Sequence, residues 1–222
     1  MAPDISTFER QFDTIKLISA KYCLEEGGSH GPDHSERVFR MALHIGKQMG
    51  ADLVILGTAA LLHDIGRKAE RESKGEICHA MHGAKLAAKE LSLSGFAQTE
   101  IGAICHCIAS HRFRKGTAPK TLEAKILFDA DKLDSIGAIG IGRAFLFAGQ
   151  IGACLHNPEL DHGTTRSYST EDSAYREFQV KMSKVKEQML TPIGKAIAQE
   201  RHQFMEIFFD QLNYEIYGLT SG

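Results

Sequence analysis

The stretch LLHDIGR, residues 61–67, ends an apolar run with a histidine and an aspartate side by side. One interpretation is a helix end that turns two polar side chains to water. The other is a metal site, since imidazole nitrogens and carboxylate oxygens are common ligands of divalent ions. Eight of the eleven histidines lie between His30 and His111, several of them beside apolar runs, and this clustering favours the metal site.

Four residues are the candidate ligands of one ion. His34 opens the first strongly amphipathic segment, and Asp131 lies in the later segment DADKLD. His63 and Asp64 close a central apolar segment. Because adjacent helical positions point about 100° apart, both can reach one ion only at a helix end. Each residue alone also has a structural interpretation, as a hydrogen-bonded core histidine or a capping aspartate. An ion held with open coordination positions would activate water at neutral pH.

The elements that would position these residues are helices. Apolar side chains recur every three or four positions over residues 34–49, 121–134 and 174–189. Residues 52–62 are apolar nearly all round, which is typical of a central helix. No segment alternates in the manner of a strand. We therefore expect an all-α fold.

Local signals mark where helices begin and where loops lie. Thr191 followed by Pro192 is typical of an N-cap with proline in the first helical turn. Polar or glycine-rich segments predict loops over residues 25–33, 66–76, 112–120 and 155–169. The last of these is long and polar, and it is either a surface loop or a lid over a site.

The bulk composition excludes several classes of protein. The chain has 222 residues, of which 43% are hydrophobic and 24% charged, and its formal net charge of −2 draws it to no nucleic-acid polymer. No apolar run reaches the roughly 20 residues that span a bilayer, and residues 1–16 lack a signal-peptide core. The five cysteines form no zinc or disulfide framework, which fits a reducing compartment. We expect a cytoplasmic protein with no membrane partner.

The order His … His-Asp … Asp on helices resembles the HD-domain superfamily of metal-dependent phosphohydrolases. The strings that carry the resemblance are HGPDHSERV, AALLHDIGR, HAMHGAKLA, AICHCIASHRF and LEAKILFDADKLDSIGAIGIGRAF. The helical tail is also similar to that of small stand-alone bacterial members. The resemblance implies a single all-α HD-type domain over residues 1–222, with a metal-binding core over 30–145 and additional C-terminal helices over 146–222.

The family's metal ligands match His34, His63, Asp64 and Asp131 in this sequence. Two imidazole nitrogens and two carboxylate oxygens suit Mn²⁺, Fe²⁺, Co²⁺, Ni²⁺ or Mg²⁺ about as well as Zn²⁺. The resemblance therefore implies a divalent metal ion as cofactor, with one ion per chain as the first expectation.

Some branches of the family hold a second ion through two further histidines. His79 matches one of them, because Gly83 and Ala84 follow it at the family's spacing, and His111 matches the other, after Ile108. The alternative for both is a buried helix histidine or a phosphate contact. Two ions per chain are therefore the second expectation.

The resemblance implies that metal-activated water hydrolyses a phosphoester or phosphoanhydride, with His63 and Asp64 as catalytic residues. The ion would lower the pKa of water toward about 7, and Asp64 would help to orient or deprotonate that water. Basic side chains near the ligands are candidate phosphate contacts, although each one alone is more simply a solvated surface residue. Arg37 and Lys132 rank first because they adjoin ligands in sequence, and the others are Arg67, Lys68, Arg112, Arg114 and Lys115. Further candidates for contact with the substrate are His30, His82 and His106.

The expected substrate is a small phosphorylated molecule, with a nucleotide as the leading candidate, since some small stand-alone relatives are nucleoside-triphosphate pyrophosphohydrolases. One departure from the family's pattern weakens the transfer of a mechanism from other nucleotide-hydrolysing branches to this chain. Several nucleotide-hydrolysing members carry an acidic residue three positions after the HD aspartate, where this chain has Arg67. The glycine-tyrosine-proline signature of cyclic-dinucleotide phosphodiesterases is also absent from the sequence.

Three alternatives compete with this hypothesis. The first is a catalytically silent regulator that binds metal and nucleotide. The second is an oxygenase that uses paired iron on the HD fold, and the third is a structural helical protein with scattered histidines. A homodimer through the C-terminal helices is the default expectation for assembly.

Overall fold

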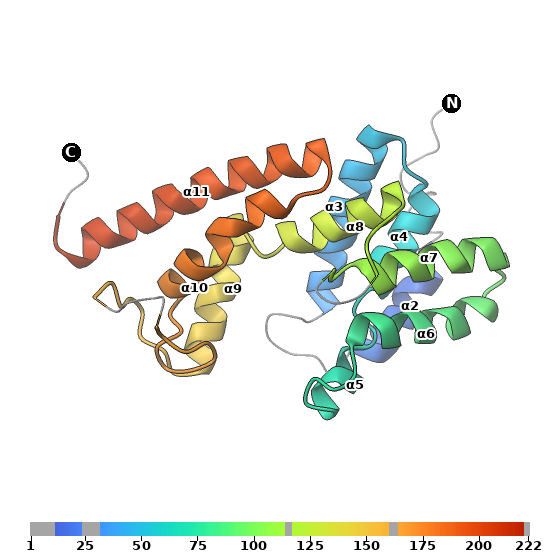
Figure 1. Ribbon diagram of the computed structural model, residues 1–222, viewed down its shortest axis with the longest axis horizontal. Helices are drawn as coiled ribbons and strands as arrows, with labels where there is room; N and C mark the ends of the chain where they lie inside the picture. The colour runs from blue at the N-terminus through green and yellow to red at the C-terminus, as the bar shows by residue number, and fades with distance from the viewer. Residues whose placement is uncertain (1–11, 24–31, 114–116, 160–163, 220–222) are drawn as a thin grey trace. The chain divides into compact units, whose positions relative to one another are not determined.

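The structure is a computed structural model that describes residues 12–23, 32–113, 117–159 and 164–219 (Figure 1). Every regular element in these residues is a helix, which confirms the predicted all-α class. The chain forms two compact units, Met1–Asp131 and Lys132–Gly222. The predicted single domain with a core over 30–145 stays a prediction.

The first unit is built around one buried helix. Its elements are α2 (Asp13–Cys23), α3 (Pro32–Met49), α4 (Leu53–Leu62), α5 (Arg67–Glu72), α6 (His79–Ser92), α7 (Gln98–Ser110) and α8 (Leu122–Leu133), which ends just inside the second unit. Helix α4 is buried from Leu56 onward, and α2, α3 and α7 pack against it. Helix α6 in turn packs against α7. The apolar run therefore forms the centre of the unit, as the sequence predicts.

The sequence explains both ends of α4. Asp52 caps its start, because a side-chain oxygen accepts hydrogen bonds from the backbone N–H groups of Val54 and Ile55 at 2.9 and 3.1 Å. The apolar side chains that follow are buried in the core. The helix ends at Leu62, and His63 is the first residue after it. The prediction that this helix ends at the His-Asp pair is confirmed.

A glycine lets the turn after α4 approach α6. A Cβ atom on Gly66 would lie 2.2 Å from the carbonyl oxygen of His79 and 2.7 Å from the backbone nitrogen of Gly83. No side chain fits in that space. The turn that carries the His-Asp pair can therefore lie against the first turn of α6, which places His79 beside Asp64.

The second unit consists of the end of α8 and the elements α9 (Gly137–Gln150), α10 (Ala174–Val180), the 3-10 helix η2 (Met182–Gln188) and α11 (Pro192–Ile216). Helix α9 packs against α10 and α11, and η2 also packs against α10 and α11. Thr191 caps α11, because its hydroxyl accepts a hydrogen bond from the backbone N–H of Gly194 at 3.0 Å. Pro192 occupies the first position of the helix, so this predicted helix start is confirmed.

Two segments differ from the sequence-based expectation. The predicted loop over 66–76 is wrong in part, because its residues 67–72, RKAERE, form the short helix α5, and all six are good helix formers. The predicted amphipathic helix over 174–189 changes midway into η2. Met182 and Val185 are both buried, and their spacing of three residues is one turn of a 3-10 helix.

Other expectations agree with the structure where it describes the chain. Residues 117–120, 155–159 and 164–169 contain no helix, as predicted for the loops to which they belong. Within the described ranges, none of the helices combines the length and the apolar composition that crossing a membrane requires.

Candidate metal centre

Six side chains from separate parts of the first unit converge in its interior. They are His34 in the first turn of α3, His63 and Asp64 after α4, His79 at the start of α6, His111 after α7 and Asp131 near the end of α8. Five of them are at most 4% exposed, and the side chain of Asp131 is 20% exposed. The cluster is therefore nearly closed to water, with Asp131 at its more open side.

The first group within the cluster consists of His34, His63 and Asp131. The Nε2 atom of His34 lies 3.3 Å from the Nε2 atom of His63 and 3.4 Å from Oδ1 of Asp131. The Nε2 atom of His63 lies 3.9 Å from the same carboxylate oxygen. One potential ligand atom from each residue lies within 4.8 Å of the others, close enough to share one ion.

The second group consists of Asp64, His79 and His111. The Oδ1 atom of Asp64 lies 3.3 Å from Nε2 of His79 and 3.7 Å from Nε2 of His111. The two imidazole Nε2 atoms are 3.1 Å apart. These three ligand atoms also lie within 4.8 Å of one another.

The carboxylate of Asp64 lies between the two groups. Its Oδ2 atom is 3.6 Å from Nε2 of His34 and 3.5 Å from Nε2 of His63, whereas Oδ1 faces the second group. The structure therefore brings the four predicted ligands together and adds the two histidines that were expected to hold a second ion or a phosphate.

The outer nitrogens of three histidines determine which way their lone pairs face. The Nδ1 atoms of His63 and His111 each lie 2.7 Å from a backbone carbonyl oxygen, of Ala60 and Ile108 respectively. A carbonyl oxygen only accepts, so we assign the hydrogen to Nδ1, and in a neutral ring Nε2 then carries a lone pair. The Nδ1 atom of His79 lies 2.6 Å from a carboxylate oxygen of Glu70, which fixes the same tautomer.

Burial favours the neutral form of His63 and His111. It lowers the pKa of His63 below its ordinary value of 6.5 and lowers the pKa of His111 to about 3. Metal-ligating imidazoles must be neutral, so this environment favours the form that can bind an ion.

The donor set fits a divalent cation. The Nε2 lone pairs of His79 and His111 face one another, that of His63 faces the ring of His34, and Oδ1 of Asp64 is buried without a hydrogen-bond partner in the described residues. Buried polar groups without partners are unfavourable, and facing lone pairs repel, unless a cation lies among them. The chemistry of the residues themselves therefore points to a bound ion.

Arg67 adds a positive charge beside the cluster. Its Nε donates to Oδ2 of Asp64 at 2.5 Å. Burial by itself raises the pKa of Asp64, but His63 and the guanidinium of Arg67 outweigh it and hold that pKa well below its usual value. Burial likewise raises the pKa of Asp131, and a hydrogen bond with His34 and the nearby His63 lower it. Both carboxylates are thus ionised at neutral pH.

The remaining predicted site residues have varied surroundings. Arg37 pairs with Asp33 on the first turn of α3, and Lys132 follows Asp131 as the first residue of the second unit. The ring of His106 accepts a hydrogen bond from the backbone N–H of Lys120, which gives it a structural role. His82 lies on α6, half-buried, and Lys68 is exposed on α5. His30, Arg114 and Lys115 lie outside the described residues.

Sequence reasoning missed Glu70. Its carboxylate contacts both His79 and Arg112, although the expected loop over 66–76 offered no reason to direct it inward. The sequence does contain a signal for Glu70, because it lies in a run of helix-forming residues, three positions after Arg67. In a helix, residues three positions apart lie on the same face.

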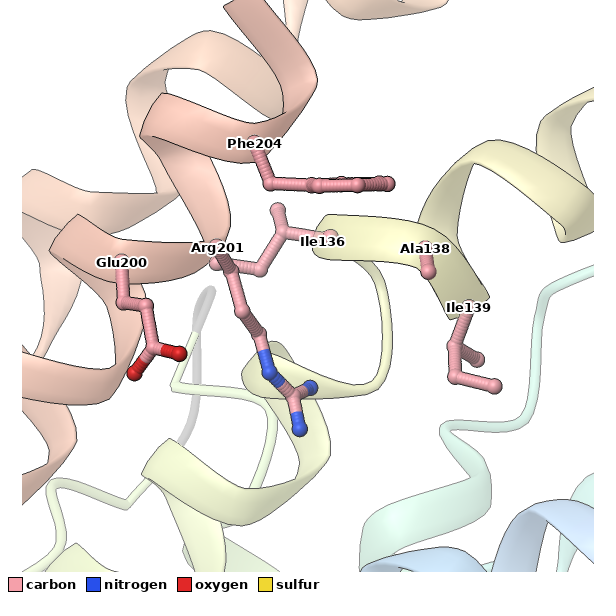
Figure 2. A pocket seen from close by; sticks show the side chains of 7 residues that line it. Ile136, Ala138, Ile139, Glu200, Arg201 and Phe204 are labelled. Atoms are coloured by element: carbon pink, nitrogen blue, oxygen red, sulfur yellow. The ribbon is translucent and has the colours of Figure 1, made fainter. Parts of the chain in front are cut away.

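A shallow hollow of about 260 Å³ on the second unit is a different feature (Figure 2). Ile136, Ile139 and Phe204 line it together with Glu200 and Arg201. The guanidinium of Arg201 points away from the Phe204 ring and donates to the carbonyl of Leu133. Arg201 therefore caps the C-terminal end of α8. The residues that line the hollow include no cluster of catalytic or metal-binding groups.

The sequence model of the HD-domain family matches residues 32–136 of this chain. The uncharacterized protein YpgQ of Bacillus subtilis is 33% identical over 217 residues, which cover 96% of this chain and 97% of that protein. The chain therefore belongs to the HD-domain superfamily. The predicted family is confirmed.

Solved structures agree with this assignment. The crystal structure of B. subtilis YpgQ in complex with ADP has a TM-score of 0.72 at 30% identity, over 94% of this chain and 99% of that chain. An HD-superfamily hydrolase from Bacillus thuringiensis has a TM-score of 0.74 at 27% identity, over 94% and 98% of the two chains. Ribonuclease Y of Chloroflexus aurantiacus is 35% identical over 121 residues, which are 54% of this chain but only 21% of that enzyme.

Proposed function

We propose that this chain is a metal-dependent phosphohydrolase whose substrate is a small nucleotide. The observation that carries the proposal is the buried cluster of imidazole lone pairs around the partnerless Oδ1 atom of Asp64. Membership in the HD-domain superfamily supports a hydrolase. The ADP in the YpgQ crystal structure supports a nucleotide, because that protein is similar to this chain over almost its whole length.

His34, His63, Asp64 and Asp131 would hold a first ion, and Asp64, His79 and His111 would hold a second. This extends the expectation of one ion to two, on the ground that the two oxygens of Asp64 face different histidines. A bound divalent ion supplies two effects: it lowers the pKa of water from about 15.7 to about 7, and it polarises a phosphoryl oxygen.

The protein residues position and isolate the reaction. We assign the carboxylate of Asp64, which lies between the two groups of ligands, to orienting the water. Arg67 and Arg112 are 22% and 27% exposed, so their guanidinium groups can meet an anionic phosphate from solvent. The buried histidines exclude bulk water, which strengthens these interactions.

Phe113 offers a surface for a nucleobase. It follows the candidate phosphate contact Arg112, its side chain is half-exposed, and its φ of 40° lies in the left-handed region that a bulky residue rarely adopts. Its ring contacts that of Phe128 edge-on at 6.5 Å between centroids, and Phe128 lies one helical turn before Asp131. Strain at an exposed aromatic residue next to the site fits a role in stacking.

The test begins with elemental analysis of the purified protein, followed by removal of metal with a chelator. The metal-free protein is then assayed with Mn²⁺ or Mg²⁺ against nucleoside mono-, di- and triphosphates, glycerol phosphate and a short RNA. We expect metal-dependent release of phosphate or pyrophosphate from nucleotides, with little cleavage of the other two substrates. If none of these compounds is hydrolysed with either ion, the proposal is wrong.

A second candidate follows from the same geometry, because two adjacent ion positions can also hold two irons. An oxygenase with paired iron would contain two irons per chain and consume dioxygen with an organic substrate without releasing phosphate. A silent regulator would bind metal and nucleotide without turnover. The same assays, with an oxygen electrode added, separate the three functions.

A further inference from the structure

Behind His79 lies a layer of charged side chains that belongs to neither group of the cluster. A carboxylate oxygen of Glu70 lies 2.6 Å from Nδ1 of His79, and the other oxygen accepts a hydrogen bond from Arg112. A guanidinium nitrogen of Arg112 lies 3.3 Å from Nδ1 of His79, and one of Arg67 lies 4.0 Å from Glu70. Glu70 is thus held from two directions while it contacts the ring.

His79 needs this acceptor because of its place in its helix. His63 and His111 follow the last turns of α4 and α7, so each can donate from Nδ1 to a backbone carbonyl three residues earlier. His79 is the first residue of α6, and no helical turn precedes it. An acceptor for its Nδ1 must come from another element, and Glu70 on α5 supplies it.

The type of acceptor changes what the imidazole can do. A carboxylate that accepts the outer N–H of a ligating histidine fixes the tautomer and the ring orientation and makes the inner nitrogen a stronger ligand. Of His63, His79 and His111, only His79 has a carboxylate in this place; the other two have backbone carbonyls. The second ion position thus includes a histidine whose orientation depends on a side chain from another element.

We propose that Glu70, supported by Arg112, is a positioning residue that controls whether the second ion position is occupied. Without Glu70, the ring of His79 can rotate or carry its hydrogen on Nε2, and in either case it no longer presents a lone pair to Asp64 and His111. The first position keeps its ligands. The inference rests on the proposed two-ion site. A purely structural Glu70, joining α5 to the end of α7, would change stability without changing the ratio of the two ion affinities.

The experiment titrates metal-free protein with Mn²⁺ in equilibrium dialysis, for the unaltered chain and for Glu70→Ala, Glu70→Gln and Glu72→Ala. Glu72 is the matched control, because it is an exposed glutamate on the same short helix. We expect two ions per unaltered chain. In Glu70→Ala the second ion should bind about 10- to 100-fold more weakly, while the first changes by no more than about twofold. Glu70→Gln, which keeps an acceptor oxygen, should show a smaller loss, and Glu72→Ala should show none.

Several outcomes overturn the inference. It is wrong if the unaltered chain binds a single Mn²⁺, or if Glu70→Ala weakens both ions equally or neither. Should Glu70→Ala fail to fold, as judged by circular dichroism, an unchanged second affinity in Glu70→Gln overturns it instead. The proposed function is tested separately. If the second ion depends on Glu70 but the protein hydrolyses no nucleotide, the proposed hydrolase activity is wrong and this inference still holds.

Discussion

Each unit buries a polar cluster, and the two clusters differ in how their charges are compensated. In the second unit, Arg176 and Asp172 are nearly inaccessible to solvent and form an ion pair of 2.7 Å. Arg176 also donates to the carbonyl of Thr165 at 2.7 Å, and the other oxygen of Asp172 accepts from the backbone N–H of Tyr168 at 2.7 Å. Positive and negative groups match, so the charges of this cluster are compensated within the chain.

The cluster of the first unit lacks that balance. Its imidazole Nε2 atoms face one another, and Oδ1 of Asp64 is buried without a hydrogen-bond donor in the described residues. The difference teaches that buried polarity alone does not indicate a binding site. An excess of buried acceptors does, because only a cation from outside the chain can compensate them.

The largest expected effect is on activity. His63→Ala or Asp64→Ala should reduce metal-dependent hydrolysis by at least roughly 10³-fold, the scale of losing a group that acts in the transition state, with helix content retained by circular dichroism. His44→Ala on the exposed face of α3 is the matched histidine control and should keep full activity. Turnover that persists in both cluster variants would show that the ligand assignment is wrong.

The second unit should respond in the opposite way. Arg176→Ala leaves Asp172 buried without its partner, which costs about 3–5 kcal/mol of unfolding free energy, measured by chemical denaturation. Mn²⁺ stoichiometry should not change. Arg166→Ala, at an exposed arginine nearby in the sequence, should stay within about 0.5 kcal/mol of the unaltered chain. An Arg176→Ala protein as stable as its parent would contradict the comparison.

Removing the metal should destabilise the protein in a pH-dependent way. At 100 times the Kd, Mn²⁺ should add about 2.7 kcal/mol, which scanning calorimetry detects as a higher Tm. Since the folded-state pKa values of His63 and His111 lie below 6.5, the unfolded chain binds protons first as the pH falls. The metal-free protein should therefore be most stable above pH 6.5 and lose stability as the pH falls toward about 3. A Tm that is independent of Mn²⁺ at neutral pH would count against any bound ion.

The smallest expected effect concerns the substrate. Base–aromatic stacking is worth about 1–3 kcal/mol, so Phe113→Ala should raise KM for a nucleotide about fivefold or more. The value of kcat should change little, and hydrolysis of any phosphoester without a base should be unaffected. Leu93→Ala, at another exposed apolar residue of the first unit, is the control. If KM for nucleotides stays the same, the base does not contact Phe113.

Local patterns in the sequence were sufficient for much of this description. Helical periodicity and the break after Leu62 predict the fold class and the helix end at the His-Asp pair, because both depend on neighbours within one or two turns. The family's spacing also singled out His79 and His111, which the structure brings beside Asp64. Their roles as ligands stay a proposal.

Other features depend on residues far apart in the chain, and only the tertiary structure decided them. Which oxygen of Asp64 faces which histidines follows from the packing of four helices, and the approach of α6 requires the space at Gly66. Asp134, three residues after Asp131, pairs with Arg143 within the second unit. The contact of Glu70 with His79 depends on a helix that the sequence suggested was a loop. A side chain's type and local period are written in the sequence, but its partners are set by where distant segments meet.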